Sequence, residues 1–223
     1  MSIHIFSPFI YIFFVKIILF LPQYPQSNIM KSFRKCHNLM LSILSFVLFL
    51  IITGETYSIG KFSSIHDMLC TSNNNNSIIK FSANAFLYSK YIEWLDTLYL
   101  HLSGKYISML QYTHHMTTVV TVYVNIVDYV SPYIIIPMGL NCFVHIPMYW
   151  YFAFPKGRLS TFKKIITIGQ IIQHILVIIS AIYTLIVDNC LQNKYGNKMG
   201  LIMYLMYLFY FIVFYMQSYL KRK

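Results

Sequence analysis

Apolar residues are concentrated in seven stretches of the chain, each about as long as a helix that crosses a lipid bilayer. Such a helix requires about 20 mostly apolar residues. No linker rich in Ser, Gly or Pro interrupts the series. The pattern predicts an all-α membrane protein with seven transmembrane helices, which form a single integral membrane domain over residues 1–223. The predicted spans lie at about 3 to 22, 38 to 54, 81 to 100, 108 to 127, 132 to 154, 165 to 187 and 199 to 220.

The composition agrees with a membrane protein. Of the 223 residues, 57% are hydrophobic and only 10% are charged, whereas about a quarter of a soluble domain is charged. The formal net charge of +11 is compatible with a nucleic-acid partner, but the basic residues lie in short clusters between apolar stretches. That distribution is typical of membrane proteins. We therefore expect the chain to contact a lipid bilayer and no nucleic acid.

Basic residues are unevenly divided between alternate loops. Loops rich in Lys and Arg generally face the cytosol. With an odd number of spans, the C-terminus is therefore expected in the cytosol and the N-terminus in the lumen. The basic-rich loops carry Lys31, Arg34, Lys35, Lys105, Lys156, Arg158, Lys163, Lys164, Lys221, Arg222 and Lys223, whereas the other loops carry Lys61, Lys80, Lys194 and Lys198.

Two of the four cysteines, Cys70 and Cys190, fall in loops on the predicted lumenal side. Disulfide bonds persist in oxidising compartments, so these residues are candidates for a bridge between the two loops. Four cysteines are too few for a disulfide-rich scaffold, and neither CxxC nor a Cys/His zinc spacing occurs. We therefore expect no metal site.

The third predicted span carries charged side chains where lipid is expected. On a helix, Lys90, Glu93, Asp96 and Thr97 fall within an arc of about 120°. Ionisable side chains inside a bilayer are costly, so their presence suggests a functional site. The alternative is an internal salt bridge that satisfies itself.

The fourth and fifth predicted spans add imidazole and amide groups. Gln111, His114 and His115 fall within about 100° of helical arc. Imidazole can act as a base, a nucleophile or a metal ligand near neutral pH. In the fifth span, Pro147 is expected to loosen the turn that carries His145. That span has a polar face made of Asn141, His145, Met148 and Tyr149, for which polar packing between helices is the alternative interpretation.

The sixth predicted span presents Thr167, Gln170 and His174 on one face, with Gln173 at its edge. Amides of this kind also commonly join helices. Four polar faces on consecutive spans favour a bundle around a buried polar chamber, because such faces turn away from lipid. Apolar residues deeper in the bundle would suit an acyl tunnel. A cytosolic rim that suits an anionic head group would comprise Lys105, Lys156, Arg158, Lys163 and Lys164.

Four motifs in these spans resemble those of the ELO family of very-long-chain fatty acid elongases. The resemblance covers residues 30 to 221 approximately and implies that the motif residues form the site. The motifs are KxxExxDT at Lys90, Glu93, Asp96 and Thr97; a histidine box at Gln111, His114 and His115; NxxVHxxMYxY at Asn141, Val144, His145, Met148, Tyr149 and Tyr151; and TxxQxxQ at Thr167, Gln170 and Gln173.

The resemblance implies an acyltransferase that condenses acyl-CoA with malonyl-CoA to give 3-oxoacyl-CoA, CO2 and CoA, without a cofactor. In this hypothesis His114 attacks the thioester to form an acyl-imidazole, while His115 and His145 orient it or move protons. Asn141 would stabilise developing negative charge. A one-step route in which a histidine only activates malonyl-CoA fits the same residues. The expected setting is the endoplasmic reticulum membrane, with a ketoacyl-CoA reductase, a dehydratase and an enoyl reductase as partners.

Three alternatives stay open. A seven-helix membrane protein could bind a lipid or another ligand in the chamber without chemistry. Gln111 at the first position of the histidine box, together with the short segment before the first span, is compatible with an inactive elongase-like scaffold. Similar histidine boxes occur in membrane di-iron desaturases, but these need more histidines than this chamber offers.

Overall fold

The structure, a computed structural model, describes residues 3–25, 27–71, 76–155 and 160–220. Within these ranges every regular element is helical, which confirms the predicted all-α class. The α-helices are α1 (Ser7–Leu19), α2 (Asn28–Ser58), α3 (Ile65–Cys70), α4 (Ser77–Ile92), α5 (Trp94–Leu102), α6 (Met109–Val124), α7 (Ile135–Ala153), α8 (Ser160–Ile186) and α9 (Lys194–Tyr215). Short 3-10 helices are η1 (Ile3–Phe6), η2 (Lys61–Ser63) and η3 (Pro132–Ile134), and a π-helical turn, η5 (Met216–Leu220), follows α9.

Three helical segments in the described ranges are long and apolar enough to cross a membrane. They are Asn28–Ser58, Phe162–Ile186 and Lys194–Leu220. The other four predicted stretches are occupied by shorter or less apolar helices: α1, the pair α4 and α5, α6, and α7. The chain is therefore a helical membrane protein, and the count of seven spans stays a prediction.

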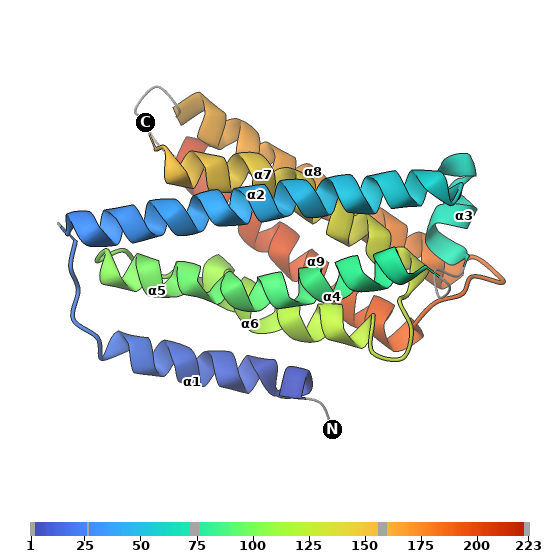
Figure 1. Cartoon of the computed structure of the whole chain (residues 1–223), viewed down its shortest axis with the longest axis horizontal. Coiled ribbons are helices and arrows are strands. Elements are labelled where there is room, and N and C mark those ends of the chain that lie inside the picture. Colours follow the sequence, from blue (N-terminus) through green and yellow to red (C-terminus); the bar gives the residue numbers. More distant parts are fainter. Residues whose placement is uncertain (1–2, 26, 72–75, 156–159, 221–223) are drawn as a thin grey trace.

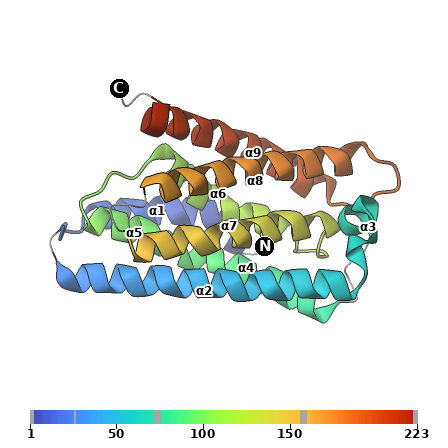
Figure 2. The same ribbon diagram turned by 90° about the horizontal axis from the view of Figure 1, so that it is seen from above.

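Six helices pack side by side to form a ring. Helix α2 packs on α7, α7 on α8, and α8 on α9; α9 then contacts α6, α6 contacts α4, and α4 returns to α2. Figure 2 shows α2, α7, α8 and α9 in this order, and Figure 1 shows α4 and α5 end to end beside α2. Helix α1 lies outside the ring and packs mainly on α6.

Polar side chains fix where several of the helices begin. The Ser27 hydroxyl accepts a hydrogen bond from the Met30 N–H, and the Ser108 hydroxyl accepts one from the Gln111 N–H. Such N-caps satisfy amide groups that have no partner inside the helix. Because Ser108 caps α6, the histidine pair lies in the second turn of this helix, close to its N-terminal end.

The outer face of α8 is apolar. Ile165, Ile172, Ile179 and Ile186 recur every seven residues, and each is between 51% and 73% exposed. Positions seven apart lie on nearly the same side of an α-helix. A continuous exposed apolar face suits contact with lipid better than contact with water, which agrees with a membrane protein.

Candidate functional site

A break in the helix after Ile92 positions the first group of site residues. Helix α4 ends there, Glu93 lies between the two helices, and α5 begins at Trp94. Lys90 Nζ donates to Glu93 Oε1 over 2.6 Å and to Asn141 Oδ1 over 2.7 Å. The Lys90 and Glu93 residues are each only 2% exposed. A buried ion pair therefore ties the end of α4 to α7.

His145 belongs to the same cluster. Its Nδ1 lies 3.5 Å from Glu93 Oε1, and its Nε2 lies 3.1 Å from Asn141 Nδ2. The amide nitrogen can only donate, so Nε2 accepts and the ring proton sits on Nδ1, facing the carboxylate. Both ring nitrogens of His145 therefore have partners, and the ring holds the side chains of Glu93 and Asn141 in place.

Asp96 forms a second polar group. Its Oδ1 lies 2.9 Å from His37 Nε2, and its Oδ2 accepts a 2.8 Å hydrogen bond from the Tyr149 hydroxyl. Tyr149 also stands edge-on to the His145 ring, with a centroid distance of 5.2 Å. Asp96 is therefore linked to the Lys90 cluster through two aromatic rings. His37 lies one residue before the second predicted span, which begins at residue 38, so the apolar pattern alone does not single it out.

The histidine pair of α6 divides between two environments. The His114 ring contacts His115 and Tyr207, and among the described residues it makes no hydrogen bond. His115 faces α1, where its ring lies 6.1 Å from that of Tyr11. His115 Nδ1 and Glu93 Oε2 are both buried without a hydrogen-bond partner in the described part of the chain. Of these three groups, His114 is the one that lines the cavity.

A cavity of about 50 Å³ lies inside the helical ring. It follows α6 from His114 to Asn125, which corresponds to about 16 Å of helix at the usual rise per residue. Its lining near the histidine box includes Lys90, His114, Asn141, His145, Gln170, Gln173 and His174, and its lining toward the other end includes Thr121, Asn125, Tyr133, Gly200, Met203 and Tyr204.

The remaining predicted site residues occupy supporting positions. Thr97 shares a 2.8 Å hydrogen bond with the Tyr11 hydroxyl, and Gln170 donates to the sulfur of Met148 over 3.3 Å. Gln111 is not among the described residues that line the cavity, and its backbone amide is bound to the helix cap.

Part of the predicted basic rim can be described. Lys105 lies in the loop between α5 and α6, where burial lowers the pKa of its ammonium group and the nearby charges of Arg34 and Lys163 lower it further. Arg34, which the sequence analysis did not assign to the rim, donates to the Ser103 hydroxyl over 3.4 Å. The cations of Lys163 and Lys164 lie over the rings of Phe214 and Tyr215. Lys156 and Arg158 lie outside the described residues.

In the ranges that the structure describes, no group of three or more His, Cys, Asp or Glu side chains is arranged to hold a metal ion. The buried charges instead satisfy one another through Lys90, Glu93 and His145.

Fold and site together define a class: a helical membrane protein with a buried cluster of lysine, carboxylate, amide and imidazole groups beside an elongated cavity. Comparison with known proteins identifies the family. Residues 1–223 match the ELO (GNS1/SUR4) family, and the chain belongs to it.

Several curated relatives carry names that describe them as fatty acid elongases or putative fatty acid elongases. The chain is 34% identical over 148 residues to fatty acid elongase A of Dictyostelium discoideum, covering 65% of this chain and 53% of that protein. It is 30% identical over 202 residues to fatty acid elongase 2 of Trypanosoma brucei brucei, covering 83% and 74% of the two chains. Putative fatty acid elongase 2 of Schizosaccharomyces pombe is 32% identical over 203 residues, which cover 83% of this chain and 54% of that protein. The chain thus spans about half to three quarters of the length of these relatives.

Proposed function

We propose that this protein catalyses the condensing step of fatty acid elongation. An acyl-CoA, malonyl-CoA and one proton would give 3-oxoacyl-CoA, CO2 and CoA. The observation that carries the proposal is the His114 imidazole, which has no hydrogen-bond partner among the described residues and lines the cavity that follows α6. A reactive group at one end of a narrow cavity suits a substrate with an activated head and a long apolar tail.

His114 is the proposed nucleophile. Its unprotonated ring nitrogen attacks the thioester carbon, the carbon–sulfur bond breaks, and the ring proton neutralises the leaving CoA thiolate. Malonyl-CoA then loses CO2, and the resulting carbanion attacks the acyl-imidazole carbon. The released imidazole nitrogen regains a proton, for which His115 is placed with its ring 5.3 Å from the ring of His114.

The cluster around Lys90 would stabilise negative charge during both steps. Lys90 donates to Asn141, whose amide nitrogen is in turn held by His145. Of the two amide protons of Asn141, one is used by His145 and the other is available for a thioester or enolate oxygen. Fixed donors of this kind assist catalysis because they need no rearrangement when charge develops.

The hydrophilic part of the substrates would bind outside the ring of helices. Lys105 and Lys163 come from different segments near the cytosolic ends of α5 and α8, and their charges influence one another. Together with Arg34 they would attract the phosphates of CoA. The Cys70–Cys190 disulfide bond at the opposite end of the molecule supports a lumenal location for that end. We therefore place the protein in the endoplasmic reticulum membrane, where the reductases and the dehydratase of the elongation cycle would use its product.

The test is incorporation of labelled malonyl-CoA into lipid by membranes that contain the protein, across a panel of acyl-CoA lengths. His114→Ala should abolish incorporation, while Cys36→Ala, which changes an exposed side chain of α2, should leave it intact. Absence of incorporation by folded wild-type protein with every primer would contradict the proposal. It would favour a ligand-binding protein or an inactive scaffold.

A second measurement separates the two chemical routes. Incubation with labelled acyl-CoA alone should leave label on His114 if an acyl-imidazole forms. Label that appears in product without ever appearing on the protein would favour the one-step route, in which a histidine activates malonyl-CoA.

A further inference from the structure

Two layers of side chains lie where the cavity meets η3, the 3-10 helix that precedes α7. The inner layer is formed by Tyr133, which lines the cavity. Tyr133 is 1% exposed and packs in one cluster with Leu69 and Cys70 of α3. The short helix α3 therefore forms the outer layer, directly behind the tyrosine that borders the cavity.

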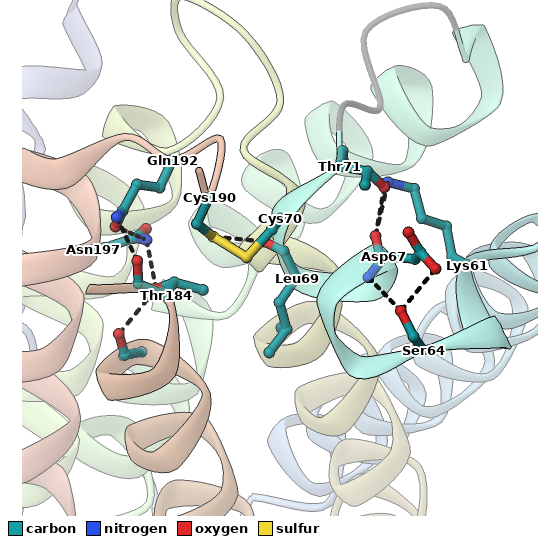
Figure 3. Close-up of a disulfide and its surroundings, with 11 residues drawn as sticks. Lys61, Ser64, Asp67, Leu69, Cys70, Thr71, Thr184, Cys190, Gln192 and Asn197 are labelled. Atoms are coloured by element: carbon teal, nitrogen blue, oxygen red, sulfur yellow. Dashed lines mark hydrogen bonds between the residues drawn. A yellow bond between two sulfur atoms is a disulfide. The ribbon is translucent and has the colours of Figure 1, made fainter. Parts of the chain in front are cut away.

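Helix α3 cannot hold this position by itself. It has six residues, and an isolated helix of this length is unstable in water. Its C-terminal end is joined covalently to the loop between α8 and α9 by the Cys70–Cys190 disulfide bond (Figure 3). The Leu191 N–H also donates to the Cys70 carbonyl over 3.1 Å.

Hydrogen bonds fix the same helix from its other side. Lys61, only 5% exposed, donates to the Asp67 carbonyl over 3.1 Å and to both oxygen atoms of Thr71. The Ser64 hydroxyl caps the first turn by accepting from the Asp67 N–H over 2.9 Å. Figure 3 shows these contacts on one side of α3 and the disulfide bond on the other. The position of α3 is thus fixed independently of the catalytic residues.

We infer that α3, fixed by the Cys70–Cys190 disulfide bond, is the floor of the acyl cavity and limits the length of acyl chain that the enzyme accepts. This inference rests on the proposed condensing function. One methylene group in an apolar pocket changes discrimination by about 10- to 200-fold. A floor that shifts by the length of one or two carbon–carbon bonds would therefore change the product profile measurably.

The experiment compares wild type with Cys70→Ala/Cys190→Ala in the incorporation assay, with saturated acyl-CoA primers of increasing length. The ratio of activity with primers too long for wild type to activity with its best primer should rise at least tenfold. Activity with the best primer should change little, because neither cysteine is among the described residues that line the cavity. Cys36→Ala, which removes an exposed thiol without a bridge, is the matched control and should keep the wild-type profile.

Leu69→Ala provides an independent test, since it removes packing behind Tyr133 and keeps the disulfide bond. It should shift the profile in the same direction, even if the double cysteine variant does not fold. An unchanged profile in folded Leu69→Ala protein would overturn the inference. If wild type itself incorporates no malonyl-CoA, the proposed function fails; if wild type is active and the profiles coincide, only the inference about α3 fails.

Discussion

At the scale of single residues, Asp96 connects the site to the helix that carries His37. This carboxylate accepts hydrogen bonds from Tyr149 and pairs with His37, and both partners are buried. If His37 were lost, Asp96 would keep one donor and gain freedom to turn away from Tyr149. We therefore regard His37 as a positioning residue: it holds Asp96, Asp96 holds Tyr149, and Tyr149 packs against the His145 ring.

We predict that His37→Phe lowers kcat about tenfold or more and changes KM little, because His37 is not among the described residues that line the cavity. His37→Gln retains a donor at nearly the same position and should recover most of kcat. Steady-state rates with malonyl-CoA at saturating acyl-CoA measure both values. A His37→Phe enzyme with wild-type kcat, or one in which only KM changes, would refute this role.

The Lys90–Glu93 pair presents a different question, because it contributes both to folding and to the site. Removing one partner of a buried ion pair typically costs about 3–5 kcal/mol, since the other charge is left unpaired. Removing both charges avoids that cost. Stability and activity should therefore respond differently to single and double substitutions.

Lys90→Met is expected to destabilise the protein by about 3–5 kcal/mol, whereas Lys90→Met/Glu93→Gln should recover more than half of this loss. Neither variant should condense acyl groups, because both lack the cation beside Asn141. Thermal or denaturant unfolding in detergent, together with the incorporation assay, measures the two effects. Equal stability of the single and double variants would contradict this prediction, because it would mean that the unpaired Glu93 carboxylate does not destabilise the protein.

Helical periodicity predicted that the charged residues between positions 90 and 97 share one face, but it did not predict which partners each of them contacts. Lys90 and Glu93 meet Asn141 and His145, whereas Asp96 meets His37 and Tyr149. Spacing along one helix fixes which side chains share a face, but not which neighbouring helix each one meets. The same limit explains why His114 lines the cavity while its neighbour His115 faces α1.

At the scale of helices, the sequence located most elements and missed one break. Residues 81 to 100 contain neither Pro nor Gly, so a single helix was expected where α4 and α5 meet at Glu93. The buried contacts of Glu93 explain the break, and they depend on α7, which lies far away in the sequence. Pro147 predicts a loosened turn rather than the end of a helix, and it lies inside α7, which runs from Ile135 to Ala153.

Close packing of α6 against α9 depends on Gly196. A Cβ atom at this position would lie 2.7 Å from Asn125 Oδ1 and 2.9 Å from Asn125 Cγ. The Asn125 side chain cannot simply turn away, because its Nδ2 donates to the Thr121 carbonyl over 2.9 Å. The sequence offered no way to distinguish this glycine from the others.

Gly196→Ala should therefore lower the free energy of unfolding by about 1–3 kcal/mol, the usual cost of overpacking a well-packed contact. Gly169→Ala is the matched control, because nothing lies within 4 Å of the added Cβ there. It should leave stability unchanged or raise it by about 0.5–1 kcal/mol through better helix propensity. Unfolding midpoints of the purified variants test both expectations, and equal midpoints would show that α9 can move away from α6.

At the scale of the whole molecule, the two ends of the bundle differ in chemistry. One end carries Lys105 together with Arg34 and Lys163, and the other carries the Cys70–Cys190 disulfide bond. The positive-inside rule predicts that the first end faces the cytosol, and the stability of disulfides favours an oxidising compartment for the second. Two independent physical arguments thus predict the same orientation, which neither the apolar pattern nor the fold determines by itself.

Cysteine labelling in sealed microsomes tests that orientation. In a Cys36→Ala background, Lys105→Cys should react with a membrane-impermeant maleimide before permeabilisation, because its loop is expected to face the cytosol. Lys80→Cys, which replaces another exposed lysine near the start of α4, should react only after the membrane is opened. The reverse pattern would show that the orientation is opposite to the predicted one. The basic groups would then face the lumen, where they could not bind cytosolic CoA thioesters. Labelling of both sites before permeabilisation would mean that the two ends are not separated by a bilayer, and the proposed spanning arrangement would then be wrong.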